Sequence, residues 1–159
     1  MTRAAGSGYS SIVAVSVGSQ TATSASRAQL SVDSLLRPWV FARGSDTTRI
    51  GGAAGGTSGL QLGVWHHVAA SVRYDTDSLF VFLDGRRIDA RQWSFGSERT
   101  PATPAYAVRL GVDDQGSLER LAGNLDEVRI SRTARSDAWM RLSYETQRPG
   151  STVVTITPE

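Results

Sequence analysis

The sequence predicts an all-β fold, an antiparallel β-sandwich with one short helix near the C-terminus. Short runs of β-branched and aromatic residues recur along the chain, and turns rich in Gly, Asp and Ser separate them. Helical spacing of apolar residues occurs in one stretch, which begins after Ser136. With 159 residues and no cysteine, the chain can bury one core without disulfides. We therefore expect a single domain over residues 1–159.

The strongest strand signals lie in the middle of the chain, at residues 65–88. Residues 65–74 are rich in aromatic and β-branched side chains, and residues 79–83 form a continuous apolar run that suits a strand covered on both faces. A polar turn joins these two runs. Asp84-Gly85 then permits the positive φ of a tight hairpin turn and begins a return strand. This region predicts an antiparallel meander.

The N-terminal part predicts three further strands and one glycine-rich loop. Residues 1–11 are small and polar, and we expect a loose arm there. The loop is expected at residues 51–59, which hold five glycines, after a brief pairing at residues 49–50. The strands are expected at residues 12–17, 27–33 and 39–42, the last opened by Pro38.

The C-terminal part predicts a long connection, more strands and the helix. Residues 90–105 form the connection, and loops of that length tend to be functional or mobile. Ser136 is the expected N-cap, and Pro149-Gly150 the expected stop. Strands are expected at residues 106–112, 118–121, 125–130 and 153–157.

Three segments resemble the signature order of laminin-G-like, concanavalin A-like jelly-roll domains. They read WHHVAA at residues 65–70, LDG at 83–85 and GNLDEVRI at 123–130, and the helix with its preceding residues is similar to the closing helix of bacterial members. The resemblance covers residues 60–147 well and residues 1–59 poorly. It implies a β-sandwich at a cell surface or outside the cell, binding glycans or proteins, in some members through a calcium ion at one rim.

The N-terminus departs from this pattern, because family members usually begin with two or more strands before the position of Ile12. Those strands are short or missing here, and an open sheet edge would then be available for an oligomer or a larger assembly. The alternative is that residues 1–11 supply a different first strand.

Glycoside hydrolysis would require two carboxylates on one side of the sugar, about 5 to 10 Å apart. Asp126 and Glu127 are adjacent, so in a strand they would point to opposite faces. We expect them to pair with an arginine or to accept backbone N–H groups. His66 and His67 are also adjacent, and we expect hydrogen bonds rather than a metal to hold them.

Calcium binding is the metal hypothesis that remains. Asp113-Asp114, with Gln115 and Ser117, forms an oxygen-rich loop, which is what calcium prefers. Asp75 and Asp77 form a second such loop. The competing interpretation is that these Asp residues only shape turns.

Trp93, Phe95 and Arg99 in the long connection are the candidate ligand-binding residues. Exposed aromatic rings with polar neighbours suit stacking on a sugar or anchoring a protein contact. The alternative is that the two rings fold back as a lid on the core. Trp39, Trp65 and Trp139 are expected in the core.

Composition excludes several classes of partner. All 17 basic residues are arginine, they are dispersed, and the net charge is +2, so a nucleic-acid-binding stripe is not expected. No stretch approaches the ~20 apolar residues of a membrane span, and residues 1–11 lack the apolar core of a signal peptide.

These observations together predict a non-catalytic recognition module for a glycan or a protein, with no required cofactor and with calcium as an optional ion. The alternative is a structural or decoration protein of a larger assembly, such as a virion or surface layer. The start at Met1 without a leader and the short N-terminus favour that alternative. A glycoside hydrolase is the remote third hypothesis.

Overall fold

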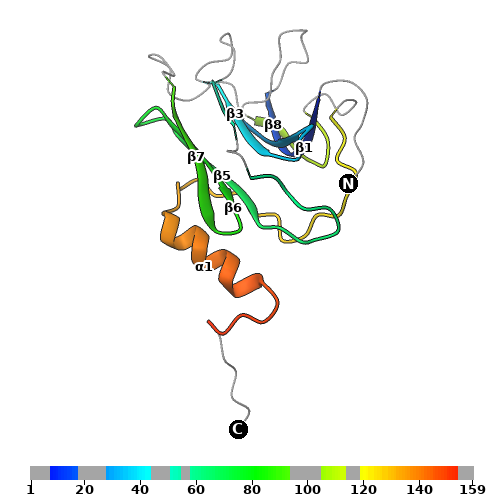
Figure 1. Ribbon diagram of the computed structural model, residues 1–159. Helices are drawn as coiled ribbons and strands as arrows, with labels where there is room; N and C mark the ends of the chain where they lie inside the picture. Colours follow the sequence, from blue (N-terminus) through cyan, green and yellow to red (C-terminus); the bar gives the residue numbers. More distant parts are fainter. Residues whose placement is uncertain are drawn as a thin grey trace.

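The computed structural model describes residues 8–17, 28–43, 51–54, 58–93, 105–113 and 119–153. Within these ranges the chain forms two antiparallel sheets and one helix, α1 (Asp137–Gln147), which lies against one end of the smaller sheet (Figure 1). The larger sheet has the order β4-β3-β2-β1-β8 and the smaller one the order β5-β6-β7. The strands are β1 (Tyr9–Val17), β2 (Ala28–Asp33), β3 (Pro38–Ala42), β4 (Gly51–Ala54), β5 (Val68–Arg73), β6 (Ser78–Leu83), β7 (Arg86–Gln92) and β8 (Ala105–Leu110). The predicted all-β sandwich with one C-terminal helix is confirmed.

The core lies between β3 of the larger sheet and β6 of the smaller sheet. Val40 and Ala42 from β3 pack with Leu79 and Val81 from β6, and all four are fully or almost fully buried. Because β6 is buried at nearly every position, its sequence is a continuous apolar run rather than an alternating one.

The β2–β3 turn is held by the carboxylate of Asp33. Its Oδ1 accepts hydrogen bonds from the backbone N–H groups of Leu35 and Arg37, each at 2.9 Å. Its Oδ2 accepts from Arg37 Nε at 2.7 Å and from Trp39 Nε1 at 3.1 Å. These bonds stabilise a turn in which Leu36 has a φ of +61°.

The helix begins and ends as the sequence predicts. The Ser136 side chain accepts a hydrogen bond from the Trp139 N–H, and Asp137 stands in the first turn, where the helix dipole favours an acidic group. The Arg148 N–H closes the last turn on the Tyr144 carbonyl, just before Pro149. In the part of the chain that the structure describes, no helix is long and apolar enough to cross a membrane.

Several predicted element boundaries were wrong. Gly51–Ala54 is strand β4 rather than loop, because residues without bulky side chains can still complete a ladder with β3. Residues 125–130 belong to no strand. Before them, Leu121 makes a single bridge. Val153 is not in a strand, and residues 154–157 lie outside the described ranges, as do residues 49–50 and 118.

The strand expected at residues 12–17 begins earlier than predicted, at Tyr9. Tyr9 already belongs to β1, so the arm expected over residues 1–11 is replaced by strand from residue 9 onward. β1 lies inside the larger sheet, between β2 and β8. Residues 1–7 lie outside the described part of the chain.

Two of the three tryptophans expected in the core are on the surface. Trp65 is 65 % exposed and lies before β5, which begins at Val68. Trp139 lies on the exposed side of α1. Trp39 is half-buried, with its ring centroid 5.8 Å from that of Phe41 and 5.8 Å from that of Tyr9.

Candidate functional site

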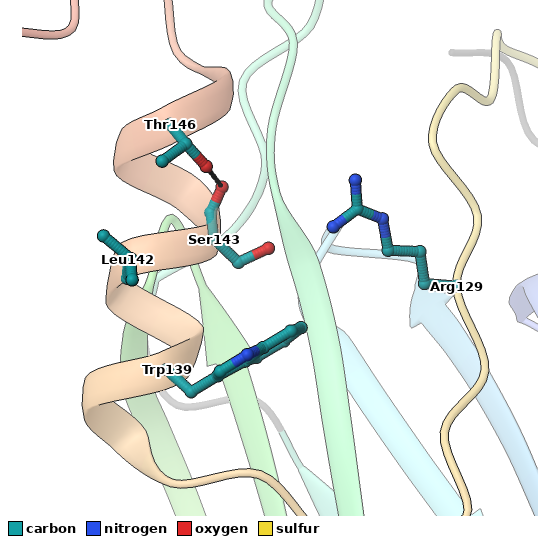
Figure 2. A pocket seen from close by; sticks show the side chains of 5 residues that line it. All are labelled: Arg129, Trp139, Leu142, Ser143 and Thr146. Atoms are coloured by element: carbon teal, nitrogen blue, oxygen red, sulfur yellow. Dashed lines mark hydrogen bonds between the residues drawn. The ribbon is translucent and has the colours of Figure 1, made fainter. Parts of the chain in front are cut away.

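A groove of about 170 Å³ lies between α1 and the extended segment that precedes it (Figure 2). We call it the α1 groove. The helix contributes side chains at spacings of three, four and seven residues, which places them on one face. Arg129 projects toward the groove from the opposite side. The lining residues are Arg129, Trp139, Leu142, Ser143 and Thr146.

The polar groups of the α1 groove keep hydrogen-bonding capacity for a ligand. The Ser143 hydroxyl points into the gap in Figure 2 and makes no hydrogen bond to the described residues. Thr146 Oγ1 donates to the Ser143 carbonyl at 3.0 Å and can still accept. One terminal nitrogen of Arg129 binds Glu127 at 2.8 Å, which leaves further guanidinium donors. The lining therefore offers several donors beside an aromatic ring.

The Trp139 ring is itself positioned by a neighbouring cation. The guanidinium carbon of Arg135 lies 5.0 Å from the ring centroid, a cation–π distance. Arg135 does not line the groove. The contact therefore orients the indole without filling the space between the helix and Arg129.

The carboxylate of Asp84 organises the β6–β7 turn and the segment before β5. Its Oδ2 lies 2.9 Å from His66 Nδ1, and its Oδ1 accepts the His67 N–H at 3.0 Å. His66 Nε2 accepts the Gln61 N–H at 2.9 Å, so the proton of the ring is on Nδ1. These bonds hold the imidazole of His66, as the sequence predicts, and they fix the entry to β5 against the β6–β7 turn.

His67 lies between Asp84, Arg129 and the helix. Its ring centroid is 6.3 Å from that of Tyr144, and its Nδ1 is buried without a hydrogen-bond partner among the described residues. Burial lowers the pKa of His67; the Asp84 carboxylate opposes this effect, and Arg129 adds to it. The imidazole is therefore neutral at neutral pH.

Asp126 and Glu127 are held by local contacts, as the sequence analysis expected. Asp126 Oδ1 accepts the Glu127 N–H at 2.9 Å, and Glu127 Oε2 binds Arg129 at 2.8 Å. Glu127 has a φ of +52°, an unusual conformation for a residue with a side chain. The two contacts stabilise this conformation.

Two of the five predicted site residues lie in the described part of the chain. Trp93 follows β7 at the end away from α1, is 42 % exposed, and donates its N–H to the Asp77 carbonyl at 2.8 Å. Asp113 follows β8 and is buried. Phe95, Arg99 and Asp114 lie outside the described ranges. No group of three His, Asp or Glu side chains that could hold a metal occurs among the residues described.

The sequence analysis missed the α1 groove. The helical part of the groove could have been predicted from residue spacing, because its four side chains share one helical face. They are Trp139, Leu142, Ser143 and Thr146. The position of Arg129 opposite them had no such signal, because it depends on how the segment before the helix crosses the smaller sheet.

One solved structure is similar in shape to this chain. It is described as an S-layer domain-containing protein from Clostridium thermocellum ATCC 27405, with 17 % sequence identity and a TM-score of 0.42. The likeness covers 91 % of this chain and 66 % of that chain, so this chain spans about two thirds of its length. The comparison with curated proteins found no match.

Family comparison agrees with the two-sheet architecture. A laminin G model, described as the concanavalin A-like lectin/glucanases superfamily, matches residues 2–141. This range includes all eight strands and the start of α1. The chain belongs to the concanavalin A-like lectin/glucanase superfamily.

Proposed function

We propose that this chain is a non-catalytic recognition module that binds carbohydrate at a cell surface or in a secreted protein. The observation that carries the proposal is the lining of the α1 groove, which combines an aromatic ring, two hydroxyls and a guanidinium. Among the residues described, the lining contains no carboxyl group. Such a groove has the groups to bind a sugar and lacks those that would cleave it.

Each group has a role in binding. The exposed part of the Trp139 ring offers a flat apolar surface for the C–H face of a sugar. The Ser143 hydroxyl and the Arg129 guanidinium offer donors to sugar oxygens. The volume of about 170 Å³ is smaller than that of ordinary drug-sized pockets, which begin at about 300 Å³. The groove therefore suits one monosaccharide unit of a longer chain, and a protein side chain is the second kind of ligand.

The superfamily includes both lectins and glucanases, so membership alone does not decide between binding and hydrolysis. Hydrolysis needs a carboxylic acid and a carboxylate that are free to act on the substrate. Asp126 binds the backbone of Glu127, and Glu127 binds Arg129. These contacts support binding without turnover.

A second binding surface is proposed at the other end of β7. Trp93 is exposed there, and the sequence places Phe95 and Arg99 in the same connection. A calcium ion at Asp113 and Asp114 is proposed with it, since rim loops rich in oxygen suit that ion. Calcium titration followed by thermal unfolding tests this part, because a ligand of the native state raises the midpoint.

The experiment that tests carbohydrate binding is a glycan array probed with the whole chain and with Trp139→Ala. The matched control is Arg132→Gln, an exposed change in the same region that leaves the groove intact. We expect glycan binding that Trp139→Ala abolishes and Arg132→Gln preserves. Binding to no glycan would refute the proposal, and turnover of a bound polysaccharide would replace it with the hydrolase.

A structural role in a larger assembly is the second candidate. Residues 123–135 are exposed throughout and make no backbone–backbone hydrogen bond within the described part of the chain. Leu125, Val128 and Ile130 in this segment are exposed apolar residues. Light scattering of the native particle tests this role, which requires a defined oligomer rather than a monomer.

A further inference from the structure

The inner face of the larger sheet is covered at one side and open at the other. Residues directly opposite one another in a ladder lie on the same face. One such row runs from Val40 on β3 through Leu30 and Val13 to Leu110 on β8. The exposed fraction rises along it from 2 % at Val40, through partly buried Leu30 and Val13, to 51 % at Leu110.

A parallel row shows the same gradient. It runs from Ala42 through Ala28 and Val15 to Val108. Ala42 is 0 % exposed and Val108 is 49 % exposed. Both rows consist of aliphatic residues on the side of the sheet that carries the core. An apolar face that remains open beside a closed core marks a contact surface.

The cause is the width of the smaller sheet. Its strands make their main contacts with β3 and β4, so they cover only that half of the larger sheet. β7 lies against β4, β6 against β3 and β4, and β5 against β3. The next position beyond β5 therefore lies over β2 and β1. Among the strands described, β5 pairs only with β6, so the edge that faces this position is open.

We propose that residues 153–157 of a second copy of this chain occupy that position as an added strand. The segment reads VVTIT, with Val154 and Ile156 on one face of a strand and Thr155 and Thr157 on the other. Val154 and Ile156 would cover the open apolar rows, and the threonines would face solvent. The segment has no charged residue to bury, and its backbone would pair with the open edge of β5.

The place where the described chain ends indicates a second copy rather than the same chain (Figure 1). The described chain ends below α1, on the far side of the helix from the two sheets (Figure 1). A helix with its side chains is about 10 Å across. Because Val154 directly follows Val153, the segment has no spare residues with which to pass the helix and then pair with β5. A neighbouring copy has no such restriction.

The first test is the concentration dependence of the solution mass, measured by analytical ultracentrifugation. Ile156→Asp places a carboxylate against the apolar rows and should weaken self-association on the order of 100-fold. Thr155→Asp is the matched control, because it adds the same charge to the solvent face and should leave self-association within a few fold. Thermal unfolding verifies that both variants keep the fold.

The second test uses the absence of cysteine from the chain. Val13→Cys and Ile156→Cys are made in separate chains of different tagged size, mixed and oxidised. A disulfide between the two sizes supports the proposal. The proposal is overturned by a monomer at every concentration, by equal loss of association in both Asp variants, or by a disulfide within one chain that carries both cysteines. It does not depend on carbohydrate binding, which the glycan array tests separately.

Discussion

Gly85→Ala should detach α1 from the β6–β7 turn. Gly85 has a φ of +73°, and an added Cβ would lie 3.0 Å from Arg141 Cα and 3.0 Å from Tyr144 Cβ. The first of these is a backbone atom of the helix, so the helix itself must shift. A positive φ costs a residue with a side chain about 1–2 kcal/mol, and overpacking adds about 1–3 kcal/mol. We expect a loss of about 2–5 kcal/mol of unfolding free energy.

Gly63→Ala is the matched control for this substitution. Gly63 has nearly the same φ, +76°, and no heavy atom lies within 4 Å of the added Cβ. Gly63→Ala should lose only the part of the unfolding free energy that comes from the positive φ, about 1–2 kcal/mol. The difference between the two variants measures the contact between the turn and the helix.

The assay is urea unfolding followed by circular dichroism, with the linear extrapolation of the unfolding free energy. Hydrogen exchange of the α1 amides gives a local readout, and it should accelerate in Gly85→Ala alone. Equal losses in the two variants, within about 0.5 kcal/mol, would refute the packing of α1 on the turn.

Three further outcomes follow from Asp33, Asp84 and His67, whose polar groups are buried or partly buried. Asp33→Asn should lose about 2–3 kcal/mol of unfolding free energy, because the neutral amide cannot keep the ion pair with Arg37 or accept all its bonds. Asp84→Ala should lose a similar amount, about 2–3 kcal/mol, because it leaves His66 Nδ1 and the His67 N–H without their acceptor. Acidification should lower the unfolding free energy below about pH 6.5, because the unfolded chain protonates His67 before the folded one does.

Each of these outcomes has a measurement that would contradict it. Urea unfolding should show the losses for Asp33→Asn and Asp84→Ala, and a loss under about 0.5 kcal/mol would contradict the carboxylate networks. The slope of unfolding free energy between pH 7 and pH 5 should decrease in His67→Gln, and an unchanged slope would contradict the buried imidazole.

Asp33 adds a second acid-dependent step at lower pH. Burial raises the pKa of Asp33, but the hydrogen bonds from Arg37, Trp39 and Leu35 outweigh it and hold the pKa below its usual value. The folded carboxylate therefore stays ionised where the unfolded one, with a pKa near 3.8, takes up a proton. The stability that the Asp33 carboxylate contributes is present above about pH 3.8. It is lost as the pH falls through the pKa that this carboxylate has in the folded protein.

The local sequence pattern was sufficient to predict much of the fold. The continuous apolar run of β6, the Asp84-Gly85 turn and the Ser136 cap are short-range signals, and each lies where the sequence predicts. Their physical basis is local, since backbone φ, turn chemistry and capping involve residues a few positions apart. The family resemblance extended this reading to the jelly-roll architecture.

The errors share one cause, which is that burial depends on distant partners. Trp65 and Trp139 are large aromatic residues of the kind that usually lies in a core, yet both are exposed. Residues 125–130 have a strand-like sequence, yet no neighbouring strand pairs with them in the described structure. β4 has a loop-like sequence and is a strand because β3 lies beside it.

By itself the sequence determined the fold class, the central meander with its Asp84-Gly85 turn, and the limits of the helix. Only the tertiary structure placed Arg129 opposite the helix to form the α1 groove. It also showed that, among the described strands, the smaller sheet packs against β3 and β4 and that Val108 and Leu110 of β8 are exposed. These two surfaces arise from the relative positions of elements far apart in the chain, which local periodicity and turn chemistry do not encode.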